Sequence, residues 1–172
     1  MEKNSKEYTY SQNKEQEKLI LDAKKMKDEH SAYIAASGYC CSPDILIRIP
    51  GGEKRIIDIK EGDLVISDSG KAALVVKINK MPVFNHKTIL VKFSDGTELE
   101  VSPLHPTACG RTFKDLTSGD LLDGKTIVSS DLVLYKHSYT YDILPDSSSG
   151  NYYANGVLIG STLVPLVLRK AS

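Results

Sequence analysis

Two adjacent cysteines, Cys40 and Cys41 in the segment SGYCCSPD, are the residues of this chain best suited to covalent chemistry. A third cysteine, Cys109, stands apart from them. Three cysteines with one adjacent pair do not form a disulfide framework, and a bridge between neighbouring residues needs strained geometry. No Cys/His cluster has the spacing of a zinc site, so we expect no metal. The alternatives that remain are a nucleophilic thiol and a small buried apolar side chain.

The composition indicates one ordinary domain with flanking elements, since the chain has 172 residues. Basic and acidic residues number 22 each, so the net charge of zero gives no support for a nucleic-acid or anionic membrane partner. The N-terminus lacks the apolar core of a signal peptide, and the longest apolar stretch, 156–168, is too short to span a bilayer. We expect a soluble chain in a reducing compartment such as the cytoplasm.

The elements that would position the cysteines differ on their two sides. Residues 12–37 are predicted to form an amphipathic helix, because apolar residues recur there at near-helical spacing while charged residues cover the other side. From residue 40 onward, short β-branched runs alternate with turns rich in Gly, Asp, Asn and Pro, which is typical of an all-β fold with hairpins. The cysteines therefore lie at the joint between a helix and a β domain.

The β region contains an internal repeat. Residues 58–65 read DIKEGDLV and residues 115–122 read DLTSGDLL, and each segment is followed by a Gly-Lys turn and another strand. An open array of repeats would need at least three copies. Two copies instead predict a closed all-β unit with pseudo-two-fold symmetry.

Three segments of the β region resemble the Hint domain, the autoprocessing module of Hedgehog proteins and inteins. CCSPDILI at 40–47 resembles the opening of that domain, in which a cysteine is the first residue. DGTELEVSPLHP at 95–106 is similar to its strand ending in Thr-x-x-His, with Ser102 and His105 at those two positions. YDILPDSSSGNYYANGVLIGST at 141–162 resembles its closing pair of strands. The duplication agrees with this resemblance, since Hint folds consist of two related β halves.

The resemblance implies a horseshoe-like, pseudo-two-fold Hint domain over 40–162, preceded by a helical flank (1–39) and followed by a short tail (163–172). It implies that Cys40, not Cys41, is the nucleophile of an N-to-S acyl shift at the Tyr39–Cys40 bond. The upstream flank would be the substrate in cis, and water, an external thiol or an amine would resolve the thioester. This single-turnover autoproteolysis needs no cofactor.

The resemblance also assigns roles to three further residues. His105 would protonate the leaving nitrogen of Cys40, and Ser102 would orient the same peptide bond. Asp142 would take the thiol proton or polarise a neighbour. The residues themselves leave simpler alternatives open: Asp142 could cap a turn, and His105 could be structural. Cys41, on the opposite face of an extended chain, is read as a packing residue.

The closing segment departs from the family pattern. Aligned on the Asn155-Gly156 turn, Gly160 and Ser161 stand where an intein has His and Asn, and Thr162 follows them. We therefore expect no full splicing, because side-chain cyclisation needs the Asn; no role is assigned to Ser161 or Thr162. A catalytically inactive Hint-like scaffold or binding module, with the N-terminal helix docked on it, is the alternative function.

The remaining histidines, His30, His86 and His137, fit no motif and are expected to be solvated. A papain-like cysteine protease is disfavoured. Its nucleophile would lie at a helix N-terminus, where the dipole lowers the thiol pKa, whereas Cys40 follows the C-terminus of the predicted helix.

Overall fold

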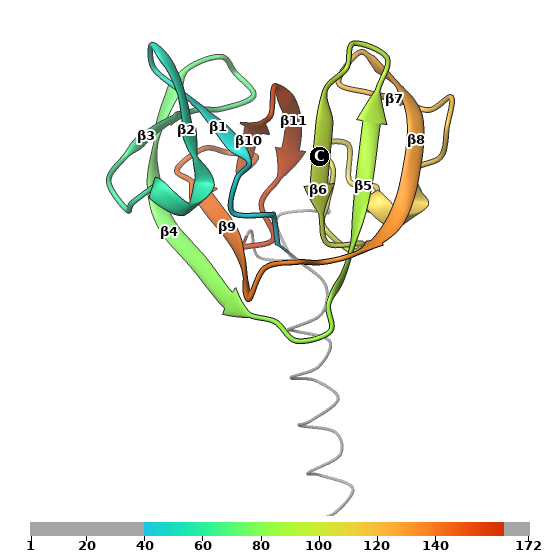
Figure 1. Ribbon diagram of the computed structural model, residues 1–172. Helices are drawn as coiled ribbons and strands as arrows, with labels where there is room; N and C mark the ends of the chain where they lie inside the picture. Colours follow the sequence, from blue (N-terminus) through green and yellow to red (C-terminus); the bar gives the residue numbers. More distant parts are fainter. Residues whose placement is uncertain (1–39, 164–172) are drawn as a thin grey trace, which may run out of the picture. The chain divides into compact units, whose positions relative to one another are not determined.

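The computed structural model describes residues 40–163, which form eleven strands and two short 3-10 helices (Figure 1). The helix predicted at 12–37, Tyr39, His30 and most of the predicted tail lie outside the described residues. No helix within this range is long and apolar enough to cross a membrane. The elements are β1 (Leu46–Ile49), β2 (Gly52–Arg55), η1 (Ile56–Asp58), β3 (Leu64–Ile66), β4 (Ala72–Pro82), β5 (Lys87–Phe93), β6 (Glu98–Val101), η2 (Phe113–Asp115), β7 (Leu121–Leu122), β8 (Lys125–Leu134), β9 (Tyr139–Pro145), β10 (Asn151–Ala154) and β11 (Val157–Gly160).

The strands pair into three antiparallel groups, with the orders β11-β10-β1-β2, β3-β4-β9 and β6-β5-β8-β7. The two longest pairings join strands that are far apart in the sequence. β4 runs beside β9 with Asn79 opposite Asp142, and β5 runs beside β8 with Ile89 opposite Leu132 (Figure 1). The predicted all-β class is confirmed.

Period-two alternation of apolar and polar residues explains why these segments form half-buried strands. The first residues of β4 alternate between exposed and buried, and β10 alternates between partly and fully buried. Tyr152 in β10 and Phe113 in η2 are the largest fully buried side chains. Burial of each large apolar side chain contributes roughly 1.5–3 kcal/mol to folding, so the core holds the site's supporting strands in place.

The repeated segments 58–65 and 115–122 adopt the same structure. Each begins at the end of a 3-10 helix, turns at a glycine with positive φ, and enters a short strand; the glycines are Gly62 (φ 88°) and Gly119 (φ 92°). In both copies the glycine N–H donates to a carbonyl of the next long strand, β4 or β8, at 2.8 Å. The predicted duplication is therefore present in the fold.

The aspartates of the two copies, Asp63 and Asp120, also share their contacts. Each carboxylate accepts the backbone N–H three residues earlier at 2.9 Å. Each also pairs with an upstream basic side chain, Asp63 with Lys54 at 2.8 Å and Asp120 with Arg111 at 3.0 Å. The G-D dipeptide thus closes the same turn twice.

The segment before β1 lies between the two long-strand pairings. Cys41 forms isolated antiparallel bridges to Val101 of β6 and to Tyr141 of β9. Its N–H donates to the Tyr141 carbonyl at 2.6 Å, and its carbonyl accepts the Tyr141 N–H at 3.0 Å. The first residues of the described chain are therefore held between β6 and β9.

Candidate active site

The four residues assigned catalytic roles are all buried in the described structure. Cys40 is 3% exposed, Ser102 1%, and His105 and Asp142 are fully buried. Such polar groups are costly to bury unless they are hydrogen-bonded or paired. Within residues 40–163, no buried side-chain nitrogen or oxygen is left without a partner. Their contacts show how this part of the core is organised.

The turn that follows β6 lies directly against Cys40. The Ser102 N–H donates to the Cys40 carbonyl at 2.9 Å, and the His105 N–H donates to the Ser102 carbonyl at 3.0 Å, which closes the S-x-x-H turn. The His105 carbonyl accepts the Phe113 N–H at 3.1 Å, and the two rings pack with centroids 6.1 Å apart. The fold thus fixes Ser102 beside the Cys40 backbone, and His105 closes the same turn.

Asp142 in β9 joins that strand to the end of β11. Its Oδ1 accepts hydrogen bonds from the Tyr152 hydroxyl at 2.7 Å and from the Ile143 N–H at 2.8 Å. Its Oδ2 accepts the Thr162 N–H at 2.7 Å, the Thr162 hydroxyl, and the Ser161 hydroxyl at 3.5 Å. The carboxylate is therefore held by donors from several segments rather than capping a single turn.

Cys41 is a core residue, as one of the sequence alternatives held, and its thiol lies near His105, the residue predicted to protonate the leaving nitrogen. Its Sγ lies 3.7 Å from the Tyr152 hydroxyl and 4.0 Å from His105 Nε2. Since the single Tyr152 hydroxyl proton is donated to Asp142, the Cys41 thiol proton points to the Tyr152 oxygen or to His105 Nε2. All three cysteines are free thiols.

The surroundings of Cys40 disfavour its thiolate. Burial, followed by the nearby Asp142 carboxylate, raises the pKa of the Cys40 thiol to about 12, although hydrogen bonds from Thr140 and Asn79 oppose the shift. Asn79 Nδ2 donates to Cys40 Sγ at 3.7 Å. Cys40 is therefore a protonated thiol at neutral pH, and its proton must leave as it attacks a carbonyl.

His86 is a site residue that the sequence does not reveal. It is predicted to be solvated, and that prediction is wrong: His86 is buried, and its Nε2 lies 2.9 Å from Ser102 Oγ. It precedes β5 directly, and β5 pairs with β6, which leads into Ser102. Only the β5–β6 register would have brought the two together, and no motif in the sequence specifies that register. His137 is exposed, as expected.

The end of β11 is closely packed. A Cβ added to Gly160 would lie 3.3 Å from the Thr107 carbonyl oxygen, so a larger side chain requires that backbone to shift. Ser161 and Thr162 follow, both hydrogen-bonded to Asp142. The position that the alignment gives to an intein histidine is thus fitted to glycine in this chain.

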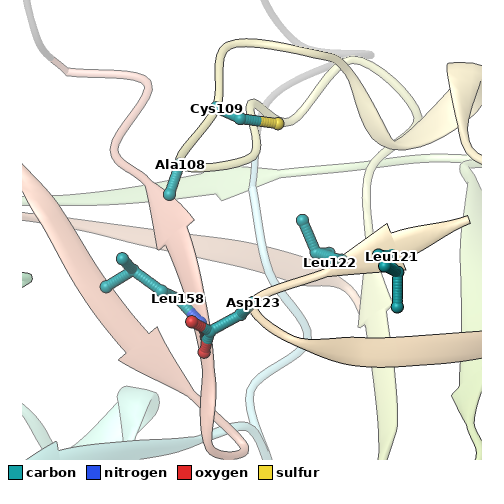
Figure 2. Close-up of a pocket in the computed structure, with 6 residues that line it drawn as sticks. All are labelled: Ala108, Cys109, Leu121, Leu122, Asp123 and Leu158. Atoms are coloured by element: carbon teal, nitrogen blue, oxygen red, sulfur yellow. Dashed lines mark hydrogen bonds between the residues drawn. The ribbon is translucent and has the colours of Figure 1, made fainter.

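A surface pocket of about 320 Å³ lies apart from the predicted catalytic residues (Figure 2). It is lined by Ala108, Cys109, Leu121, Leu122, Asp123 and Leu158. The Asp123 carboxylate beside it accepts the Leu158 N–H at 3.0 Å. None of the four predicted catalytic residues lines this pocket. Among residues 40–163, no group of three or more His, Cys, Asp or Glu side chains is arranged to hold a metal ion.

Comparison with known proteins finds solved structures that share this architecture. No protein-family model matches the chain, and no curated protein matches it. Among solved structures, the gp41-1 intein is 25% identical with a TM-score of 0.60, covering 73% of this chain and 100% of that one. The MchDnaB-1 intein is 25% identical with a TM-score of 0.60, covering 70% and 99%.

A bacterial intein-like domain from Clostridium thermocellum is 20% identical, with a TM-score of 0.62, and covers 73% of this chain and 100% of that domain. All three solved structures are covered almost completely. The match therefore extends over a whole domain in each case rather than over one hairpin. The β domain of this chain has the Hint fold of inteins and bacterial intein-like domains.

Proposed function

We propose that this chain is a self-processing Hint-like module in which Cys40 carries out an N-to-S acyl shift at the Tyr39–Cys40 bond. The product is a thioester, followed by N-terminal cleavage or acyl transfer without full protein splicing. One observation carries the proposal: the S-x-x-H turn donates the Ser102 N–H to the Cys40 carbonyl at 2.9 Å. This hydrogen bond holds the turn that carries the Ser102 hydroxyl and the His105 imidazole against the backbone of Cys40, the residue whose peptide bond would break.

The acyl shift is an isomerisation in which every atom is retained. Cys40 Sγ attacks the carbonyl carbon of Tyr39 and loses its proton, and the carbonyl oxygen becomes an oxyanion. When that oxyanion collapses, the bond from the carbonyl carbon to the Cys40 nitrogen breaks, and the nitrogen takes up a proton. His105 is the proposed donor of that proton, and Asp142 is the proposed base or polarising group near the thiol.

The thioester is then open to substitution. Attack by water gives a carboxylate at Tyr39 and restores the Cys40 thiol, whereas an external thiol or amine takes over the acyl group. One group in the site supports the first step: the Asn79 amide donates to Cys40 Sγ, and this hydrogen bond favours the thiolate. Because the pKa of Cys40 is about 12, the rate should rise with pH through the neutral range.

The proposal excludes full splicing. Ser161 stands where the family has the cyclising Asn, and its hydroxyl is donated to Asp142 at 3.5 Å. A serine side chain has no amide nitrogen with which to form a succinimide, so the bond that follows it is not cleaved by that route. Processing would end with the N-terminal step.

The test is intact-mass analysis of the purified full chain, incubated with and without a strong thiol nucleophile. A fragment that begins at Cys40 should appear with the thiol, and a Cys40→Ala variant should remain whole. Cys41→Ala is the matched control, because it removes the adjacent thiol and should still be cleaved. Its folding is checked by thermal unfolding.

The competing function is a catalytically inactive Hint-like scaffold or binding module. The raised pKa of Cys40 favours it, since a buried protonated thiol is a weak nucleophile. A wild-type chain that stays whole at every thiol concentration and pH tested would establish this alternative and overturn the acyl shift.

A further inference from the structure

His86 and Ser102 form a buried pair next to Cys40. Their side chains meet with His86 Nε2 2.9 Å from Ser102 Oγ, while Ser102 is 1% exposed and His86 is 7% exposed. The N–H of the same Ser102 holds the Cys40 carbonyl at 2.9 Å. A change at His86 would therefore reach the Cys40 backbone through one hydroxyl group.

The surroundings of His86 hold its ring in place. The Tyr135 ring packs edge-on against it with centroids 5.5 Å apart, and the Tyr135 N–H donates to the His86 carbonyl at 3.0 Å. The charged and titratable groups around the ring are Glu100 on β6, whose carboxylate accepts the Thr88 hydroxyl at 2.6 Å, and Tyr135 itself. His137 is exposed, and its ring packs against the Tyr135 ring with centroids 5.2 Å apart.

The contact between His86 and Ser102 has two forms because the Ser102 hydroxyl has one proton. When Ser102 donates that proton to Nε2, its oxygen is left as an acceptor only. When Nε2–H donates to Ser102, the serine proton is free to point to another oxygen. Only the second form leaves the Ser102 hydroxyl able to donate a hydrogen bond in the reaction at Cys40.

We propose that His86 is a positioning residue for the acyl shift: its Nε2–H donates to Ser102 Oγ and thereby frees the Ser102 hydroxyl proton to donate at the Cys40 peptide bond. This inference rests on the proposed function. It assigns to the serine the part of a hydrogen-bond donor at Cys40 and to the histidine the part of the group that orients it.

The electrostatics of the pair agree with this role. Burial lowers the pKa of His86, and the nearby Glu100 carboxylate opposes that shift. The ring is therefore neutral near pH 7 and carries one proton, whose position sets the direction of the hydrogen bond. Protonation at lower pH adds a second ring proton and makes Nε2 a donor in every molecule.

The experiment measures the rate of thiol-induced cleavage at Cys40 in a double-mutant cycle of His86→Phe and Ser102→Ala in the full chain. We expect each single variant to lose about a hundredfold in rate, the loss that follows when a group at the reacting bond is misplaced by about 1 Å. Because His86 acts through Ser102, the double variant should be no slower than Ser102→Ala alone.

Two further variants separate positioning from a general structural effect. His86→Gln retains an N–H donor and should recover most of the rate. His137→Phe changes another histidine in contact with Tyr135 and should leave the rate unchanged. Additive losses in the double variant, or wild-type rates in His86→Phe, would overturn the inference while leaving the proposed function intact.

A measurement on the wild-type chain covers the case in which His86→Phe fails to fold. Side-chain ¹⁵N NMR near pH 7.5 should show His86 as a neutral ring protonated at Nε2. An unprotonated Nε2 would overturn the inference whether or not the chain cleaves. A wild-type chain that never cleaves would overturn the proposed function itself.

Discussion

Cys40 and Cys41 are neighbours in the chain, but each meets a different set of partners. Cys40 is hydrogen-bonded by Asn79, whereas Cys41 contacts Tyr152 and lies 4.0 Å from His105 Nε2. Burial raises the pKa of both thiols, and the Asp142 carboxylate adds to the shift. Both are therefore protonated at neutral pH. Because both are buried, each thiol can lose its proton only to a neighbouring group of the site and not directly to solvent.

Cys109 differs from Cys40 and Cys41 in both its exposure and the direction of its pKa shift. It is exposed, and a hydrogen bond with Thr107 lowers its pKa, with the backbone and charge of Arg111 contributing less. Its Sγ lies 3.2 Å from Thr107 Oγ1. The thiolate is the reactive form of cysteine, so exposure and a lowered pKa both favour reaction at this residue.

We therefore predict that iodoacetamide at pH 7.5 adds one carbamidomethyl group to the folded chain, and that it adds to Cys109. Peptide mass spectrometry locates the adduct. A Cys109→Ser variant should remain unlabelled under the same conditions, and unfolding in urea should open Cys40 and Cys41 to the reagent. Labelling of Cys40 in the folded chain at a rate comparable to that of Cys109 would contradict the burial described above.

At the scale of elements, the repeated unit of 3-10 helix, glycine turn and short strand supports the two long strands. Gly62 and Gly119 have positive φ values of 88° and 92°, which L side chains rarely adopt. An added Cβ at either position would meet nothing within 4 Å. The glycines are thus required by backbone conformation and not by a close contact.

We predict that Gly62→Ala and Gly119→Ala each lower the free energy of unfolding by about 1–2 kcal/mol, the cost of a left-handed conformation for a residue with a Cβ. Urea denaturation measures the change. Gly52→Ala is the matched control, because Gly52 lies in β2 without a positive φ and also has open space around it. Equal stabilities for all three variants would show that the repeated turns carry no conformational strain.

At the scale of the whole molecule, several neutral acids are buried together. Burial raises the pKa of Cys40, Cys41, Tyr135 and Tyr152 above their ordinary values, and for all except Tyr135 the Asp142 carboxylate is the second cause. Each group therefore keeps its proton in the folded chain at pH values where the unfolded chain has released it.

The sign of the resulting pH dependence follows from proton counting. Below about pH 9, the unfolded pKa of the two thiols, both states keep the thiol protons and the contribution of the thiols to the free energy of unfolding is fully present. As the pH rises from about 9 toward the folded pKa of about 12 for Cys40, the unfolded chain loses its thiol protons first and this contribution is lost. We predict that the free energy of unfolding falls above pH 9, with a slope that approaches about 1.4 kcal/mol per pH unit for each of the two thiols. Urea denaturation at pH 7 to 10 measures it. Cys40→Ala should show a shallower decline, and a flat profile in the wild type would contradict the prediction.

Part of the fold and of the site is readable from the sequence because it depends on local order. Period-two alternation predicts the strands and the G-D dipeptides predict the repeated turns, while the resemblance to Hint motifs singles out Cys40, Ser102, His105 and Asp142. These features belong to segments of a few residues, in which backbone geometry and side-chain direction are set by near neighbours.

The tertiary structure decided which of those residues meet, and under what conditions. The approach of Cys41 to His105 and to Tyr152 joins positions 64 and 111 residues apart, and the His86–Ser102 pair depends on how β5 pairs with β6. Strand register is set by the packing of the whole core, so no local pattern specifies it. The pKa values follow the same rule, since burial is a property of the folded molecule.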